Sequence, residues 1–302
     1  MQYKYDNGLN KWGKPKHSHM LDLYDTGDFK RLTGTSSVVD VLAKVLTWWA
    51  SGEAVKTLGW IHPDIKKGGK KIGEVPLKER IASAHKVLTK IKRIKPDKYL
   101  ELLDNAYKAH SVRLDDSAKA GTDLHAELER FVKFMMNGKI GESMDFDERI
   151  QPFRDWAFHA VKRYFWSEAH CFHEGLWVGG ISDVGVELNA QVIETPDGQI
   201  EVPDGTLAII DFKSAKEVYS SHFIQGAGYA LQVEQNGLWD ADGNFIGNPT
   251  TKRPIEAIII VPFGAEIVYP EIRMKVKQYK EDFIHCLALY RSLGMDKSEY
   301  KK

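Results

Sequence analysis

Cysteine is nearly absent from the sequence, since Cys171 and Cys286 are the only two among 302 residues. Two thiols cannot build a disulfide framework, and they cannot supply the four thiolates that an iron–sulfur cluster needs. We therefore expect a protein of a reducing, intracellular compartment, without an iron–sulfur cluster.

Long hydrophobic runs are missing as well. The longest covers residues 257–263, far below the roughly 20 residues that a membrane-spanning helix requires. Residues 1–14 lack the apolar segment of a secretion signal. The sequence therefore predicts a cytoplasmic protein with no membrane partner, long enough for one large domain or two ordinary ones.

Net charge is also absent, because 42 Lys and Arg balance 42 Asp and Glu. The charge is nevertheless uneven: residues 64–98 contain twelve basic and four acidic residues. Such a run alone is most often a solvated helix face, but beside a catalytic site it would form a track for a polyanion. We name this run the basic track, with seven principal residues: Lys66, Lys67, Lys70, Lys71, Lys90, Lys92 and Arg93.

The hydrophobic pattern changes along the chain. Helical spacing dominates residues 35–165 and ends in a predicted helix over 147–165. β-branched residues broken by Gly and Pro-Asp-Gly turns then predict short strands over 168–210. The expected fold is α/β, a mixed β-sheet flanked by helices and preceded by a helical region. The expected divisions are an arm (1–34), a helical basic region (35–120) and a core (121–302).

Acidic residues stand on two neighbouring predicted strands. Asp211 and Lys213 end the apolar run LAIIDFK and share one strand face, while Asp183 ends GGISD. Two such acids repel unless a cation lies between them, and Mg²⁺ or Mn²⁺ would accept Asp183, Asp211 and the backbone carbonyl of Phe212 as ligands. His125, in a helix predicted over 121–136, would complete the set. The alternative is a solvated strand-end ion pair and an ordinary helix histidine.

Four ordered motifs resemble those of the PD-(D/E)XK nuclease superfamily, in its RecB-like exonuclease branch. GTDLHAELE resembles the helix that carries the metal-binding histidine, GGISD the GxxD motif, IIDFKSAK the (D/E)xK motif, and Gln225 to Tyr229 the QxxxY motif. The resemblance covers residues 121–229 and implies metal ligands at His125, Asp183 and Asp211.

The same resemblance assigns further roles. It implies catalysis by Lys213 with Asp183 and Asp211, supporting acids at Glu129 and Glu168, and DNA contacts from Gln225 and Tyr229. Ser182 departs from the family pattern, because the superfamily name has proline at that place. Asp211 follows Asp183 by 28 positions, which is longer than the usual spacing, and VIETPDGQIEVPDG predicts an extra hairpin that fills the gap.

The resemblance implies a DNA exonuclease that uses one or two Mg²⁺ or Mn²⁺ ions and acts in replication, recombination or repair. The implied setting is a bacterial or phage-infected cell, and the implied partners are single-stranded or free-ended DNA and a recombination or single-strand-binding protein. A restriction-type endonuclease and a catalytically silent DNA-binding module remain alternatives. An unrelated hydrolase is disfavoured, because no nucleophile elbow, phosphate loop or HExxH motif occurs.

Overall fold

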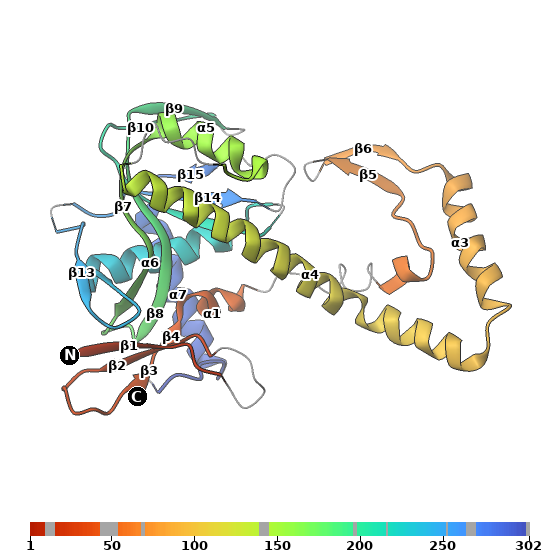
Figure 1. Ribbon diagram of the computed structural model, residues 1–302, viewed down its shortest axis with the longest axis horizontal. Coiled ribbons are helices and arrows are strands. Elements are labelled where there is room, and N and C mark those ends of the chain that lie inside the picture. The colour runs from red at the N-terminus through yellow and green to blue at the C-terminus, as the bar shows by residue number, and fades with distance from the viewer. Residues whose placement is uncertain are drawn as a thin grey trace. The chain divides into compact units, whose positions relative to one another are not determined.

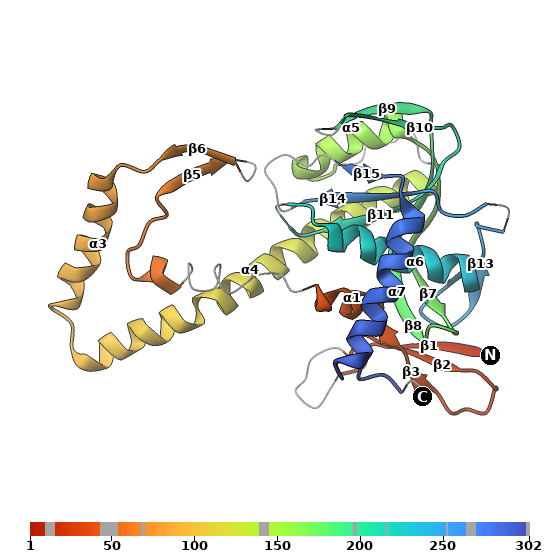
Figure 2. The same cartoon turned by 180° about the vertical axis from the view of Figure 1, so that it is seen from behind.

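The computed structural model describes residues 1–9, 16–42, 54–67, 70–138, 145–195, 198–215, 217–251, 253–263 and 270–299. The chain divides into two units: unit 1 is Met1–Leu42 with Leu124–Lys302, and unit 2 is Ala43–Asp123. Figures 1 and 2 show their elements from opposite sides. No helix in these stretches combines the length and apolar character needed to cross a bilayer.

A mixed sheet forms the centre of unit 1. Eight strands of the described chain take part, in the order β13-β12-β7-β8-β11-β14-β15, with β4 also paired to β8. β11 runs parallel to β14 and antiparallel to β8, so the predicted mixed sheet is confirmed. The strands are β4 (Thr33–Gly34), β7 (Val161–His173), β8 (Val178–Leu188), β11 (Leu207–Lys213), β12 (Leu238–Trp239), β13 (Phe245–Gly247), β14 (Ala257–Pro262) and β15 (Glu271–Arg273).

Helices cover both faces of this sheet (Figures 1 and 2). On one face lie α5 (Gln151–Ala160) and the end of α4 (Pro96–Met136), a helix that begins in unit 2. On the other face lies α6 (Ser220–Asn236), which packs against α7 (Val276–Ser292). The predicted flanking of a mixed sheet by helices is therefore present.

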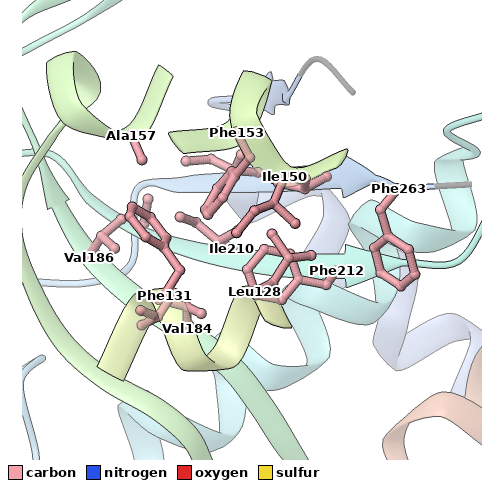
Figure 3. Packing of buried hydrophobic residues seen from close by; sticks show 14 of the residues in the cluster. Leu128, Phe131, Ile150, Phe153, Ala157, Val184, Val186, Ile210, Phe212 and Phe263 are labelled. Carbon is pink, nitrogen blue, oxygen red and sulfur yellow. The ribbon is translucent and has the colours of Figure 1, made fainter. Parts of the chain in front are cut away.

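The main core joins α4 and α5 to the sheet (Figure 3). Leu128 and Phe131 of α4 meet Phe153 of α5 over Val184 and Ile210 of the sheet, and all five are almost completely buried. The two phenylalanine rings lie edge to face, with centroids 5.9 Å apart. Burial of each such side chain stabilises the fold by about 1.5–3 kcal/mol, so this apolar stripe fixes the rotation of α4 about its axis.

The predicted helix over 147–165 is wrong in its second half. The 3-10 turn η2 (Glu148–Ile150) and α5 end at Ala160, and β7 begins at once with Val161. Val161 and Tyr164 suit a helical stripe as well as a strand, but β7 pairs with β8 from Val161 to His173. Long-range pairing therefore decides what local periodicity leaves ambiguous.

Residues 1–34, for which the sequence predicts a loose arm or a short hairpin, contain a small sheet. β1 (Gln2–Asp6), β2 (Ser18–Asp22) and β3 (Lys30–Arg31) form an antiparallel sheet. Tyr3 and Leu21 of this sheet pack on Phe172 of β7 and on Trp177, just before β8. The sheet is therefore part of unit 1. These contacts lie far apart in sequence, which is why composition alone suggested a loose segment.

Unit 2 contains the hairpin of β5 (Asp64–Lys67) and β6 (Lys70–Glu74), then α3 (Leu77–Ile91) and the first part of α4. The Lys- and Gly-rich composition of residues 65–73 (IKKGGKKIG) predicts a loop here, and the structure has a hairpin instead. Helical spacing of apolar residues predicts a helix over residues 38–50. The structure has the short α1 (Thr35–Val38) and η1 (Val39–Val41) at its start, and the part from residue 43 lies outside the described residues. In unit 1, β9 (Gln191–Thr195) and β10 (Gly198–Val202) are the predicted extra hairpin.

Candidate functional site

Three neighbouring strands bring three acids into one row. The β7–β8 register pairs Ser167 with Val184 and Ala169 with Ser182, which puts Glu168 opposite Asp183. On the other side of β8, Ile210 pairs with Val184, where the β8–β11 register ends, and Asp211 is the next residue of β11. The backbone N–H of Phe212 donates a hydrogen bond of 2.7 Å to Asp183 Oδ2 and fixes that carboxylate.

Helix α4 adds an imidazole to this row. His125 Nε2 lies 3.5 Å from Asp183 Oδ2 and 3.7 Å from Glu168 Oε1. The ligand atoms of His125, Glu168 and Asp183 all lie within 4.8 Å of one another, a spacing that one metal ion could span. The imidazole also stands edge-on to the ring of Phe212, with centroids 5.6 Å apart, which limits its rotation.

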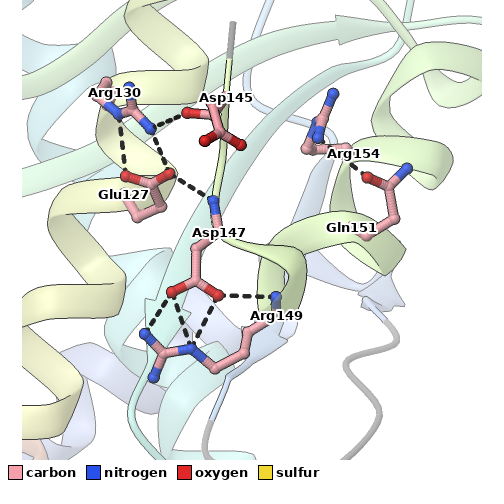
Figure 4. Close-up of polar contacts among 7 residues, drawn as sticks. All are labelled: Glu127, Arg130, Asp145, Asp147, Arg149, Gln151 and Arg154. Atoms are coloured by element: carbon pink, nitrogen blue, oxygen red, sulfur yellow. Dashed lines mark hydrogen bonds and ion pairs between the residues drawn. The ribbon is translucent and has the colours of Figure 1, made fainter.

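A polar cluster beside the core holds α4 in place (Figure 4). Glu127 accepts hydrogen bonds from the backbone N–H of Asp147 (2.8 Å) and from Arg130 Nη2 (2.6 Å), and the same guanidinium donates to the carbonyl of Asp145. Asp147 in turn accepts from the backbone N–H of Arg149 and starts η2. These contacts tie α4 to the segment before α5, two residues from His125.

The backbone of Glu168 is strained. Its φ of +51° lies in the left-handed region, which residues other than glycine seldom adopt. Such conformations cost about 1–3 kcal/mol and persist where surrounding contacts impose them, often at functional sites. The strain coincides with the place where the side chain meets His125 and Asp183.

Crowding of acids in a buried place changes their protonation. Burial, reinforced by the charge of Asp183, raises the pKa of Glu168 from 4.5 to about 8. Burial also raises the pKa of Asp211 from 3.8 to about 6, against the opposing influence of Lys213. The pKa of His125 is raised chiefly by its interaction with Asp183. This excess of negative charge would be relieved by a bound cation.

Asp211 and Lys213 form a separate pair next to this group. Lys213 Nζ lies 2.6 Å from Asp211 Oδ2 and forms an ion pair with it. The same ammonium donates a hydrogen bond to Gln225 Oε1, 3.1 Å away. Within the described residues the buried Asp211 Oδ2 accepts no well-formed hydrogen bond. A buried carboxylate oxygen with a free lone pair is suited to a metal ion or a proton.

Helix α6 carries the second half of the site. Gln225 accepts from Lys213 through Oε1 and donates from Nε2 to Tyr229 OH at 2.8 Å. The two residues stand one turn apart on α6 and are both buried. Burial raises the pKa of Tyr229 well above its ordinary value, so the phenol remains neutral.

Most of the predicted site residues therefore lie together in unit 1. Glu129 lies one turn beyond His125 and pairs with Lys133, and its charge helps to raise the pKa of His125 and Glu168. The sequence predicts His125, Asp183 and Asp211 as the metal ligands. The three residues whose ligand atoms converge in the structure are His125, Asp183 and Glu168. The carbonyl of Phe212 as a ligand remains a prediction.

The basic track belongs to unit 2. Lys90 lies in the last turn of α3, and Lys92 and Arg93 follow the end of that helix; all three are exposed. The side chains of the other four track residues, on β5 and β6, lie outside the described part of the chain. A DNA-binding role for the seven residues therefore remains a prediction.

Sequence reasoning missed a cavity of about 410 Å³ beside Tyr229. Its walls come from the N-terminal sheet, the start of α1 and β8, and include the cationic side chains of Lys16 and Arg31 with Gly179 and Gly180. No local pattern in residues 1–34 indicates this cavity, because its walls are distant in sequence.

Comparisons with known proteins add no assignment. No family model matches the chain. No curated protein matches it either.

Proposed function

We propose that this protein is a divalent-metal-dependent DNA exonuclease that hydrolyses phosphodiester bonds. One observation carries the proposal: His125, Glu168 and Asp183 converge beside the Asp211–Lys213 pair. Carboxylate oxygens with one imidazole suit Mn²⁺, and the carboxylates suit Mg²⁺. The acidic row and the high pKa of Glu168 fit a cation, and Asp211 Oδ2, which is paired with Lys213 at 2.6 Å, accepts no well-formed hydrogen bond within the described residues.

His125, Glu168 and Asp183 would hold the ion, with Asp211 at its edge. The cation would supply positive charge beside the scissile phosphate and acidify the attacking water. The chain provides the remaining chemistry. Gln225 keeps the ammonium of Lys213 in place, where it would offset phosphoryl charge or orient the water. Asp211, with a pKa of about 6, would accept a proton near neutral pH.

Two further features support a polyanionic substrate. The cavity next to Tyr229 contains Lys16 and Arg31, and unit 2 contains 17 Lys and Arg against 10 Asp and Glu. Contacts between such groups and phosphates would be independent of sequence and weakened by salt. We therefore expect the substrate to be DNA, single-stranded or with free ends.

The test uses end-labelled linear single- and double-stranded DNA and a covalently closed circle, with Mn²⁺, Mg²⁺ or EDTA. We expect linear DNA to be degraded with Mn²⁺ or Mg²⁺, and the circle to survive. Asp183→Asn and Lys213→Met should abolish degradation, while the exposed-site controls Asp242→Asn and Lys162→Met should not. Cleavage of the circle would indicate an endonuclease, and metal-independent DNA binding without degradation would indicate a silent binding module.

A further inference from the structure

A polar side chain lies in the core just beyond the Gln225–Tyr229 pair. Gln232 is completely buried, and an amide in such a place is costly unless its hydrogen bonds are satisfied. Its Nε2 donates to Thr35 Oγ1 at 2.7 Å and to the carbonyl of Gly228 at 2.9 Å. Its Oε1 accepts a weak hydrogen bond from the thiol of Cys171, with Sγ 3.6 Å away. Every polar atom of this amide therefore has a partner.

Thr35 extends the connection to β8. It is 1 % exposed and donates from Oγ1 to the carbonyl of Gly179 at 3.0 Å. A Cβ at Gly180 would lie 2.6 Å from Tyr229 Cε1 and 2.7 Å from Thr35 Oγ1. Both side chains therefore press on the bare backbone of Gly180, three residues before Asp183. Gln232 and Thr35 thus connect α6, the start of α1 and β8.

The same helix face leads from this connection to the lysine. Gln225, Tyr229 and Gln232 are spaced four and three residues apart on α6, so they lie along one side of the helix. Because Tyr229 OH holds Gln225 Nε2, the amide oxygen of Gln225 must face Lys213. Any shift of Tyr229 against Gly180 would release that amide and let the ammonium move.

We infer that Gln232 and Thr35 are positioning residues, which fix Tyr229 against Gly180 and thereby hold Gln225 and Lys213 in register with Asp183. This inference rests on the proposed nuclease activity. Gln232 is completely buried, and Thr35, which lies at the wall of the cavity beside Tyr229, is only 1 % exposed, with its hydroxyl bonded to Gln232 and to the carbonyl of Gly179. Their role is therefore not to bind the substrate or the metal ion. Their contribution is geometric, because small displacements of catalytic groups cost large factors in rate.

The experiment compares Thr35→Val, Gln232→Leu and the double variant with Thr35→Ser, in Mn²⁺-dependent degradation of labelled linear DNA. Thr206→Val is the matched control, because Thr206 is a buried threonine that donates to a backbone carbonyl, of Pro203 at 2.8 Å, at the opposite end of β11. We expect Thr35→Val and Gln232→Leu to lower kcat roughly ten- to a hundredfold with little change in KM. Thr35→Ser should retain parental kcat.

The double variant separates geometry from stability. It replaces both hydrogen-bonding partners with apolar groups, so its unfolding midpoint should return towards that of the parent, while its kcat should stay low. Parental kcat in Thr35→Val, or a loss no larger than in Thr206→Val, would overturn the inference. A parent that degrades no DNA would overturn the proposed function. An active parent whose variants keep parental kcat would overturn only the inference about Gln232 and Thr35.

Discussion

Glu168→Gln should stabilise the metal-free protein at neutral and alkaline pH. Burial and the neighbouring Asp183 raise the pKa of Glu168 from 4.5 to about 8. In the unfolded chain this carboxyl loses its proton near pH 4.5, whereas in the folded protein it keeps the proton until about pH 8. The contribution of Glu168 to the stability of the parent is therefore most favourable below pH 4.5. That contribution is lost as the pH rises from 4.5 to about 8. Glutamine cannot ionise and escapes this loss.

The size of the effect follows from the two pKa values. Each pH unit between them costs about 1.4 kcal/mol. The parent should therefore lose up to about 3 kcal/mol by pH 7 and about 5 kcal/mol above pH 8. These are upper limits, because the side chain is 28 % exposed and interacts with its neighbours.

The assay is urea unfolding with EDTA at pH 4, 7 and 9, comparing the parent, Glu168→Gln and the exposed-site control Glu201→Gln. The gap between Glu168→Gln and the parent should open as pH rises, and the control should follow the parent. Added Mn²⁺ should stabilise the parent more than Glu168→Gln, because the ion favours the ionised carboxylate. Parallel pH profiles for the parent and Glu168→Gln would refute the electrostatic reasoning.

Two further predictions concern packing. Phe153→Ala removes a fully buried ring from between α5 and the sheet and should lower the free energy of unfolding by about 3–5 kcal/mol, measured by urea titration; a loss below 1 kcal/mol would contradict the packing described for the main core. Gly180→Ala places a Cβ 2.6 Å from Tyr229 Cε1, so it should cost about 1–3 kcal/mol of stability. Gly73→Ala is its control, because a Cβ at Gly73 would meet nothing nearer than the side chain of Ile65 at 3.7 Å, an ordinary van der Waals contact. A Gly180→Ala variant as stable as the parent would show that Tyr229 does not press on β8.

Local pattern was sufficient for the parts of the site that lie in regular elements. The apolar run before Asp211 predicts a buried strand, which is β11, and the spacing of Gln225 and Tyr229 predicts a shared helix face, which α6 provides. The mixed sheet and the extra hairpin also follow from turn residues and β-branched runs.

Other parts depend on contacts that a local pattern does not contain. Val161 to Phe165 adopt a strand because β8 is available to pair with them. The left-handed backbone of Glu168 occurs within that strand pairing, and the conformational preference of a glutamate does not predict it. The packing of the N-terminal sheet on Phe172 and Trp177, and the cavity beside Tyr229, both join segments more than a hundred residues apart.

The connections of residues 33–35 have a consequence for biosynthesis. Thr35 meets Gln232 across 197 residues, and Thr33 donates to Asp296 across 263 residues. At about 5–20 residues per second, a ribosome needs roughly 10–50 s to make the intervening chain. Residues 33–35 must therefore wait for α6 and then for the residues after α7. A growing chain already carries Asp183 and Asp211 when these contacts form, so the site is fully assembled only after α6 and the residues that follow α7 have been made.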